Sequence, residues 1–120
     1  MKKLIKGVVI KGNGVGRRLG FPTVNLKGFF DLEYGVYGCV CVINGTRLVG
    51  ALHYGPRKTF NDSVELMEIH LLDFEGDLYG KKIEIEVYNK IREVKKFENE
   101  EDLKQAIAED VEAVGKLELI

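Results

Sequence analysis

The sequence lacks a large excess of charge of either sign. Its 120 residues carry 18 Lys and Arg against 19 Asp and Glu, which leaves a formal net charge of -1. A general nucleic-acid binder, or a protein that adheres to acidic membranes, needs a basic excess. We therefore expect no nucleic-acid partner and no membrane partner.

Long hydrophobic runs are also missing. No apolar run approaches the ~20 residues that span a bilayer. A signal peptide needs an apolar stretch after its basic start, and here Lys6 interrupts that stretch. There are only two cysteines, Cys39 and Cys41. Their i,i+2 spacing is poor for a disulfide, and nothing indicates an oxidising compartment. These features predict a reduced, cytoplasmic protein.

What is present suits one small domain. The chain is 45% hydrophobic, which is enough for one core, and its length is typical of a single domain. It contains no internal repeat and no low-complexity linker. We expect one domain over residues 1–120, acting as a monomer.

The hydrophobic pattern of residues 1–90 predicts strands. We expect them at residues 4–10, 36–43, 46–54, 64–74 and 81–88. Both faces of the second are apolar, as in a closed barrel or a covered sheet. The Asn44–Gly45 pair that follows it is a strong signal for a type I′ hairpin turn.

The last segment changes its period. Apolar residues recur at helical spacing at Leu103, Ala106, Ile107, Val111 and Val114. Asn99 is the expected N-cap, the acidic residues 100–102 suit the first turn, and Gly115 is the expected stop. The predicted class is mainly β, a small antiparallel barrel with one C-terminal α-helix packed on it.

Two segments could carry chemistry. Gly12, Gly14 and Gly16 do not form a dinucleotide fingerprint, because Arg17 stands where the third glycine is needed. The cluster is either a flexible turn or a loop whose bare backbone approaches phosphates, helped by Arg17 and Arg18.

The second segment follows directly. Thr23 and Asn25 come after Pro22, and on an extended segment their side chains face the same side. A hydroxyl and an amide oxygen are hard ligands of the kind that Mg²⁺ prefers. The alternative is an ordinary turn begun by the proline, in which both side chains bond the backbone.

The residues around this segment match the signature of a known protein family. The stretch GRRLGFPTVNL at residues 16–26 closely resembles the G-R-x-L-G-F-P-T-A-N signature of riboflavin kinases of the ATP-dependent bacterial and eukaryotic type. Four further motifs follow in the family's order: Gly35-Val36-Tyr37, residues 55–60 (GPRKTF), residues 68–74 (EIHLLDF) with 77–80 (DLYG), and Ile91-Arg92 with residues 95–97 (KKF). The resemblance covers nearly the whole chain.

The resemblance implies a six-stranded antiparallel Greek-key β-barrel, in agreement with the pattern above. It implies an ATP:riboflavin 5′-phosphotransferase, which moves the ATP γ-phosphoryl group to the ribityl 5′-hydroxyl of riboflavin and gives FMN and ADP. ATP is then the co-substrate, and the expected cofactor is Mg²⁺, with Zn²⁺ or Mn²⁺ as alternatives. Because an alcohol is a poor nucleophile at neutral pH, a base must lie within hydrogen-bond reach of it.

The resemblance also assigns site residues. Glu68 matches the catalytic glutamate, and it would face the substrate if its neighbours Met67 and Ile69 face the core. Thr23 and Asn25 match the Mg²⁺–nucleotide ligands. The matches expected to contact ATP are Gly12, Arg17 or Arg18, Pro22, Leu71, Asp73 and Tyr79, with a core position as the alternative for Leu71. The matches expected to contact riboflavin or FMN are Arg92, Lys95 and Phe97, with a solvated charge as the alternative for Lys95.

Some positions depart from the family pattern. His53 stands where an asparagine is usual, and Glu93 stands where a proline commonly follows the flavin-loop arginine. His53 and His70 are expected to be structural, because neither has the sequence neighbours of a metal site or a nucleophile triad.

Two alternatives to an ATP-dependent kinase remain. One is a non-catalytic flavin- or nucleotide-binding sensor module, and the other is a riboflavin kinase that uses another nucleotide such as CTP. Many bacterial relatives also carry an adenylyltransferase domain with paired histidines, which makes FAD from FMN. His53 and His70 lie on separate predicted strands, and the barrel and helix use nearly all 120 residues, so we expect this chain to stop at FMN.

Overall fold

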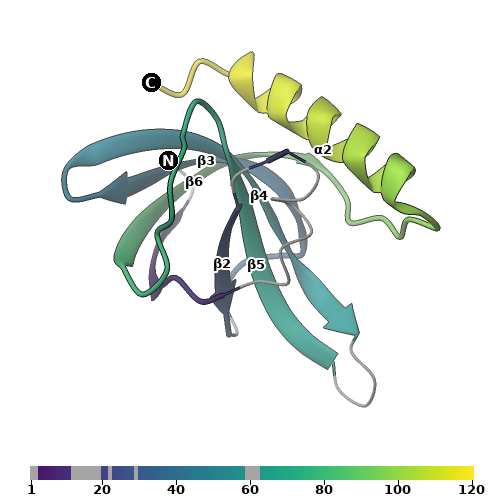
Figure 1. Ribbon diagram of the computed structural model, residues 1–120, viewed down its shortest axis with the longest axis horizontal. Coiled ribbons are helices and arrows are strands. Elements are labelled where there is room, and N and C mark those ends of the chain that lie inside the picture. Colours follow the sequence, from purple (N-terminus) through teal and green to yellow (C-terminus); the bar gives the residue numbers. More distant parts are fainter. Residues whose placement is uncertain (1–2, 12–19, 22, 29, 59–62) are drawn as a thin grey trace.

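A single antiparallel sheet and a helix make up the fold (Figure 1). The computed structural model describes residues 3–11, 20–21, 23–28, 30–58 and 63–120. In this part of the chain the elements are β1 (Lys3–Val8), β2 (Thr23–Lys27), β3 (Gly35–Ile43), β4 (Thr46–Lys58), β5 (Ser63–Leu71), β6 (Lys82–Arg92) and α2 (Glu100–Gly115). None of the helices in these ranges is long and apolar enough to cross a bilayer.

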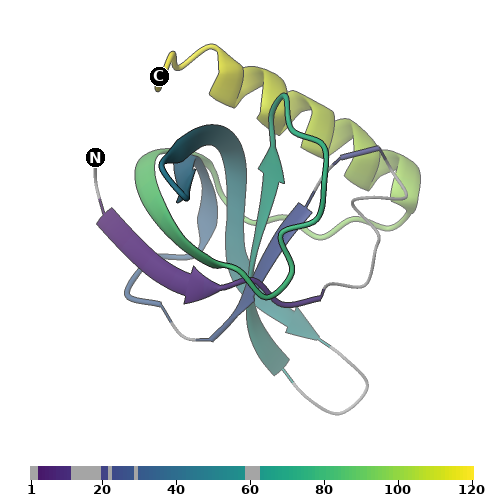
Figure 2. The same cartoon turned by 60° about the vertical axis from the view of Figure 1, so that its left-hand side comes forward.

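The sheet is strongly curled (Figure 2), and the hydrophobic core lies inside the curl. Its strand order is β1-β6-β3-β4-β5-β2, and neighbouring strands are antiparallel. The two edge strands approach each other where Ile10 and Asn25 form an isolated bridge, with the Ile10 N–H donating to the Asn25 carbonyl at 2.8 Å. The prediction of a mainly β fold with six antiparallel strands and a C-terminal helix is confirmed.

The turn between β3 and β4 is the predicted one. Asn44 has φ 51° and Gly45 has φ 81°, and Ile43 pairs with Thr46. Positive φ at both central residues is the signature of a type I′ turn, whose twist matches that of the flanking strands. This hairpin sets the register between β3 and β4 at the centre of the sheet.

Alternating side chains fill the interior of the curled sheet. Ile83, Ile85 and Val87 of β6 are buried, as their spacing predicts. The interior cluster contains Ile5, Val9, Val24, Leu26, Tyr37, Cys39, Cys41, Ile43, Leu52, Tyr54, Met67, Ile69, Leu71, Ile83, Ile85 and Val87. Both cysteines are free thiols, as expected, and burial raises the pKa of Cys39.

Helix α2 covers part of the outer face of the sheet (Figure 1). Asn99 is its N-cap and accepts a 2.9 Å hydrogen bond from the Asp102 N–H, as predicted. Val114, near the other end of the helix, is fully buried. A Cβ at Gly38 of β3 would lie 2.7 Å from Leu117 and 3.8 Å from Val114. The missing side chain at Gly38 therefore lets the C-terminal segment lie close to the sheet.

The observed strand ends differ from the predicted ones. β4 continues to Lys58, beyond the predicted end at residue 54, because it stays paired with β5 through Pro56 and Lys58. β5 ends at Leu71 and not at residue 74, because Asp73 adopts φ 53° and cannot continue an extended strand.

Candidate active site

Strand β5 presents two different faces. Met67, Ile69 and Leu71 point into the core, so Glu68 and His70 between them point to the outer face of the sheet. This is the orientation that the alternation predicted for Glu68. The core therefore fixes the strand and sets these two polar side chains on the opposite face.

Three polar residues form a row across the sheet on that outer face. Asn25 of β2 lies directly opposite Glu68 of β5, and Glu68 lies directly opposite His53 of β4. Directly opposed residues of antiparallel strands have Cβ atoms roughly 4.5–5.5 Å apart. The row therefore brings an amide, a carboxylate and an imidazole together from positions far apart in the sequence.

A second row lies beside the first. Thr23 is opposite His70, and His70 is opposite Ala51. Thr23 Oγ1 donates to the Phe21 carbonyl at 3.0 Å. His70 Nδ1 lies 3.3 Å from Thr23 Oγ1. His70 is only 5% exposed, and its ring meets the ring of Phe21 edge-on. The two rows thus place Thr23 and Asn25 side by side on β2, next to Glu68.

The Asn25 side chain is a buried polar group. Asn25 is 8% exposed, and within the described ranges no residue forms a hydrogen bond to its side-chain amide. Buried polar groups almost always have a partner. Together with the Thr23 hydroxyl on the same strand face, this amide oxygen fits a hard cation or its bound waters. In the described part of the chain no three His, Cys, Asp or Glu side chains gather around a metal position.

A cavity of about 550 Å³ lies on the other side of Glu68. Its residues come from β3, β4, β5, β6, the segment after β6, and α2. They are Val36, Ala51, His53, Gly55, Pro56, Leu66, Glu68, His70, Arg92, Val94, Lys95, Lys96, Phe97, Leu103, Ile107 and Asp110. Glu68 therefore stands between the cavity and the two oxygen-bearing side chains of β2. The cavity also brings the predicted flavin residues Arg92, Lys95 and Phe97 to the same place as Glu68.

Arg92 joins the sheet to the helix at this cavity. Its Nε and Nη2 each donate to one carboxylate oxygen of Asp110, both at 2.7 Å, and its Nη1 donates to the Glu93 carbonyl at 2.9 Å. Asp110 is only 7% exposed. Such two-point pairs fix both side chains. The ring of Phe97 lies 6.0 Å from the Arg92 guanidinium, so the pair also supports the segment that carries Phe97.

The sequence analysis missed the role of Asp110. In the sequence it is one more acidic residue on a charged helix, because the signal that buries it is the position of Arg92 on a distant strand. His70 was expected to be structural, and it is buried. His70 follows Glu68 by two residues on one strand, and this spacing was the sequence signal that both side chains lie on the same face of the sheet.

Burial lowers the pKa of both histidines at the site. For His53 and for His70, the loss of solvent is the largest cause, and the negative charge of Glu68 acts in the opposite direction. Both imidazoles are therefore neutral at neutral pH.

The residues expected to contact ATP do not all lie together. Leu71 is in the core, on the face of β5 away from Glu68, so its packing supports the alternative that it is a core residue. Asp73 is exposed and lines a hollow beside the end of α2. Tyr79 is 55% exposed, with Lys11 Nζ 5.2 Å from its ring centre. Gly12, Arg17, Arg18 and Pro22 lie outside the described residues.

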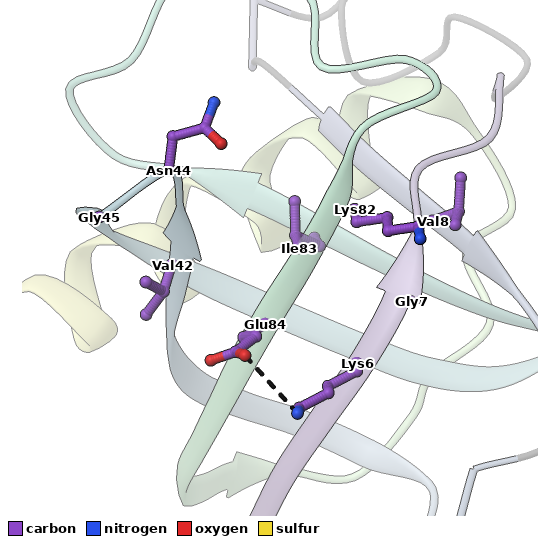
Figure 3. Close-up of a pocket in the computed structure, with 9 residues that line it drawn as sticks. All are labelled: Lys6, Gly7, Val8, Val42, Asn44, Gly45, Lys82, Ile83 and Glu84. Carbon is purple, nitrogen blue, oxygen red and sulfur yellow. Dashed lines mark ion pairs between the residues drawn. The ribbon is translucent and has the colours of Figure 1, made fainter.

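A second cavity, of about 530 Å³, lies against β1, β6 and the β3–β4 turn (Figure 3). Lys6 of β1 and Glu84 of β6 form a 3.7 Å ion pair there, with the Lys6 side chain largely exposed and the Glu84 side chain about half exposed. None of the residues expected to act on a substrate lines this cavity. The chemistry therefore points to the cavity beside Glu68.

Comparisons with known proteins identify the family. The family model for flavokinase, described as riboflavin kinase, matches residues 2–117. The chain belongs to the riboflavin kinase family. The resemblance that the sequence motifs indicated is thereby confirmed.

Curated relatives of this riboflavin kinase family member are longer proteins. An RNA-binding riboflavin kinase of Bacillus subtilis is 40% identical over 94% of this chain, which spans 50% of that protein. A bifunctional riboflavin kinase/FMN adenylyltransferase of Haemophilus influenzae is also 40% identical, over 90% of this chain and 36% of its own length. The chain therefore spans half or less of these relatives.

Solved structures share the fold. A chain from Streptococcus pneumoniae, named a macrolide-efflux protein, matches with a TM-score of 0.81 and 28% identity over 93% of this chain and 38% of its own. Riboflavin kinase from Trypanosoma brucei matches with a TM-score of 0.62 and 23% identity over 95% of this chain and 78% of its own. The second likeness supports the fold alone.

Proposed function

We propose that the protein is an ATP:riboflavin 5′-phosphotransferase, which converts riboflavin and ATP to FMN and ADP. The observation that carries the proposal is the position of Glu68. It faces a cavity of about 550 Å³ and is directly opposite Asn25 in the sheet register. A carboxylate between a ligand-sized cavity and a pair of hard oxygen atoms suits transfer of a phosphoryl group to an alcohol.

Glu68 acts as the general base. The ribityl 5′-hydroxyl gives its proton to the Glu68 carboxylate as its oxygen forms a bond to the γ-phosphorus of ATP. The bond from that phosphorus to the β,γ-bridging oxygen breaks, and ADP leaves. Without the base the alcohol is a weak nucleophile, and a positioned base typically contributes ~10²–10⁴-fold.

Thr23 and Asn25 hold the nucleotide side of the reaction. Their oxygen atoms share one face of β2 beside Glu68, and they would bind the Mg²⁺ that accompanies ATP. A bound Mg²⁺ supplies neutralisation of the phosphate charge. The identity of the ion is part of the proposal, and Zn²⁺ or Mn²⁺ is the alternative.

The cavity beside Glu68 receives the flavin. Phe97, Leu103 and Ile107 give it apolar walls on the side of α2, and Lys95 supplies a cation. An aromatic side chain can cover the isoalloxazine ring, and a cation can bind the phosphate that forms. The Arg92–Asp110 pair holds the helix and this segment over the cavity.

The test is to incubate purified protein with riboflavin, Mg²⁺ and either ATP or CTP, and to separate flavins and nucleotides by chromatography. The proposal expects FMN and ADP in equal amounts with ATP. FMN formation only with CTP would identify the chain as a CTP-dependent riboflavin kinase. Flavin binding without any FMN would identify the chain as a non-catalytic binding module.

A further inference from the structure

The Thr23 hydroxyl is held by two neighbours. Its Oγ1 is 3.0 Å from the Phe21 carbonyl oxygen and 3.3 Å from His70 Nδ1. A threonine hydroxyl has one proton and two lone pairs. Because a carbonyl can only accept, the hydroxyl proton points to Phe21. The long contact with His70 is then a hydrogen bond only if Nδ1 carries the proton.

The imidazole of His70 is fixed from several sides. Its strand pairs with β2 so that His70 is directly opposite Thr23, and on the other side it is opposite the small residue Ala51. Phe21 meets its ring edge-on at a centroid distance of 6.2 Å. With 5% of its surface exposed, the ring has little freedom to change rotamer.

These contacts determine how many lone pairs of Thr23 Oγ1 remain for a further partner. Its proton is given to Phe21, and when His70 Nδ1 carries a proton one lone pair accepts from it, so that a single lone pair of Oγ1 remains for a third partner. Asn25, two residues further on the same strand face, carries a buried amide. The hydroxyl is therefore presented as an acceptor, which is the form that a cation requires.

We propose that His70 is a positioning residue, which holds Thr23 Oγ1 through its Nδ1–H as an acceptor for the magnesium–nucleotide complex. The inference rests on the proposed function, because it assigns His70 a part in nucleotide binding. His70 takes no proton from the substrate and touches no reacting atom. Outer partners of this kind typically change metal affinity ~10–100-fold when they are lost.

Two substitutions at His70 separate positioning from packing. In His70→Asn the amide nitrogen stands at the same number of bonds from Cα as Nδ1, so it can still donate to Thr23. In His70→Leu the volume is largely kept and the donor is lost. A residue that only fills space would be replaced better by leucine, whereas a residue that donates would be replaced better by asparagine.

The first measurement is the affinity for Mg–ADP by calorimetry, which needs no turnover, with riboflavin affinity measured in parallel by flavin fluorescence. We expect His70→Leu to weaken Mg–ADP binding about tenfold or more, and His70→Asn to recover most of it. Riboflavin affinity should fall less than Mg–ADP affinity in His70→Leu, because His70 is only one of the residues that line the flavin cavity. In a Thr23→Val background, His70→Leu should have little further effect, because the two residues act as one unit.

The second measurement is the tautomer of His70 in the wild-type protein, read from its imidazole ¹⁵N shifts, and it requires no variant to fold. A proton on Nδ1 supports the inference, and a neutral ring protonated on Nε2 overturns it. Mg–ADP binding that is unchanged in His70→Leu also overturns it while the proposed function stands. A wild-type protein that binds no Mg–ADP overturns both.

Discussion

Asn25 and Glu68 lie directly opposite each other in the register of β2 and β5. The first is a buried amide on the strand that carries Thr23, and the second lines the cavity below α2. This pairing connects the two halves of the proposed site, because one residue faces the nucleotide side and the other the flavin side. A shift of β2 by one residue would turn Thr23 and Asn25 into the core.

The two oxygen ligands on β2 should matter for the nucleotide and not for the flavin. We expect Thr23→Val and Asn25→Leu each to lower the apparent affinity for Mg–ATP at least about tenfold, because each removes an oxygen atom that the bound cation would use. Initial rates against Mg²⁺ and ATP concentration provide the measurement. Thr46→Val, at the exposed start of β4, is the matched control. An unchanged Mg²⁺ dependence would make the residue a turn former.

The pair of Arg92 and Asp110 should stabilise the fold and shape the cavity. Asp110→Leu leaves the partly buried Arg92 charge without its carboxylate partner. We expect a loss of about 2 kcal/mol in the free energy of unfolding, less than the ~3–5 kcal/mol for a fully buried pair. Riboflavin affinity should fall as well, because a contact that holds α2 against the sheet beside the cavity is lost.

Urea unfolding and flavin fluorescence measure these two effects. The matched control is Glu112→Leu, which removes an acidic residue of the same helix whose ion pair with Lys116 is exposed. It should change the stability by less than about 0.5 kcal/mol. Equal losses in the two variants would mean that the Arg92–Asp110 contact contributes nothing specific.

The stability of the fold should depend on His53 below neutral pH. Burial lowers the pKa of His53 in the folded protein from its ordinary value of 6.5. Below pH 6.5 the unfolded chain therefore binds more protons at this position than the folded one. The free energy of unfolding should fall as pH drops from there toward the lowered pKa.

His53→Asn removes this proton uptake and should flatten the fall. Urea unfolding at about pH 7.5 and about pH 5.5 would compare the two proteins. The pKa of His70 is lowered by the same cause, so part of the fall should persist in the variant. A variant that loses as much stability as the wild type would rule out a contribution from His53.

The chain should make FMN and no FAD. The two histidines, His53 and His70, lie on adjacent strands at the proposed kinase cavity, so neither belongs to a separate nucleotide site. Incubation of the 120-residue protein with FMN, ATP and Mg²⁺ should yield no FAD on chromatography. Enzyme-dependent FAD would contradict this prediction.

Local patterns in the sequence predicted much of the fold. The Asn44–Gly45 turn and the Asn99 cap depend on a few neighbouring residues, and both were predicted correctly. The alternation of β6 also identified its buried face. Strand β2 was not predicted from its pattern, because its alternation is only five residues long and follows a proline that also suits a turn. Only the resemblance implied a sixth strand.

The candidate site was less predictable, because it depends on which strands are neighbours. Strand alternation gives the face of Glu68, but only the β2–β5 and β4–β5 pairings bring Asn25 and His53 beside it. The bond between Thr23 and His70 and the burial of Asp110 arise in the same way. Leu71 was assigned to ATP by resemblance, whereas its alternation with Glu68 places it in the core.

The central claim is that Glu68 is the base that activates the riboflavin hydroxyl. Glu68→Gln keeps the size and polarity of the side chain but removes its ability to take a proton. The most direct measurement compares the rate of FMN formation by the two proteins at saturating riboflavin and Mg–ATP, with the affinity for each substrate measured separately. We expect binding within about twofold of wild type and a rate lower by ~10²–10⁴-fold. Near-full turnover by Glu68→Gln at neutral pH would contradict the account.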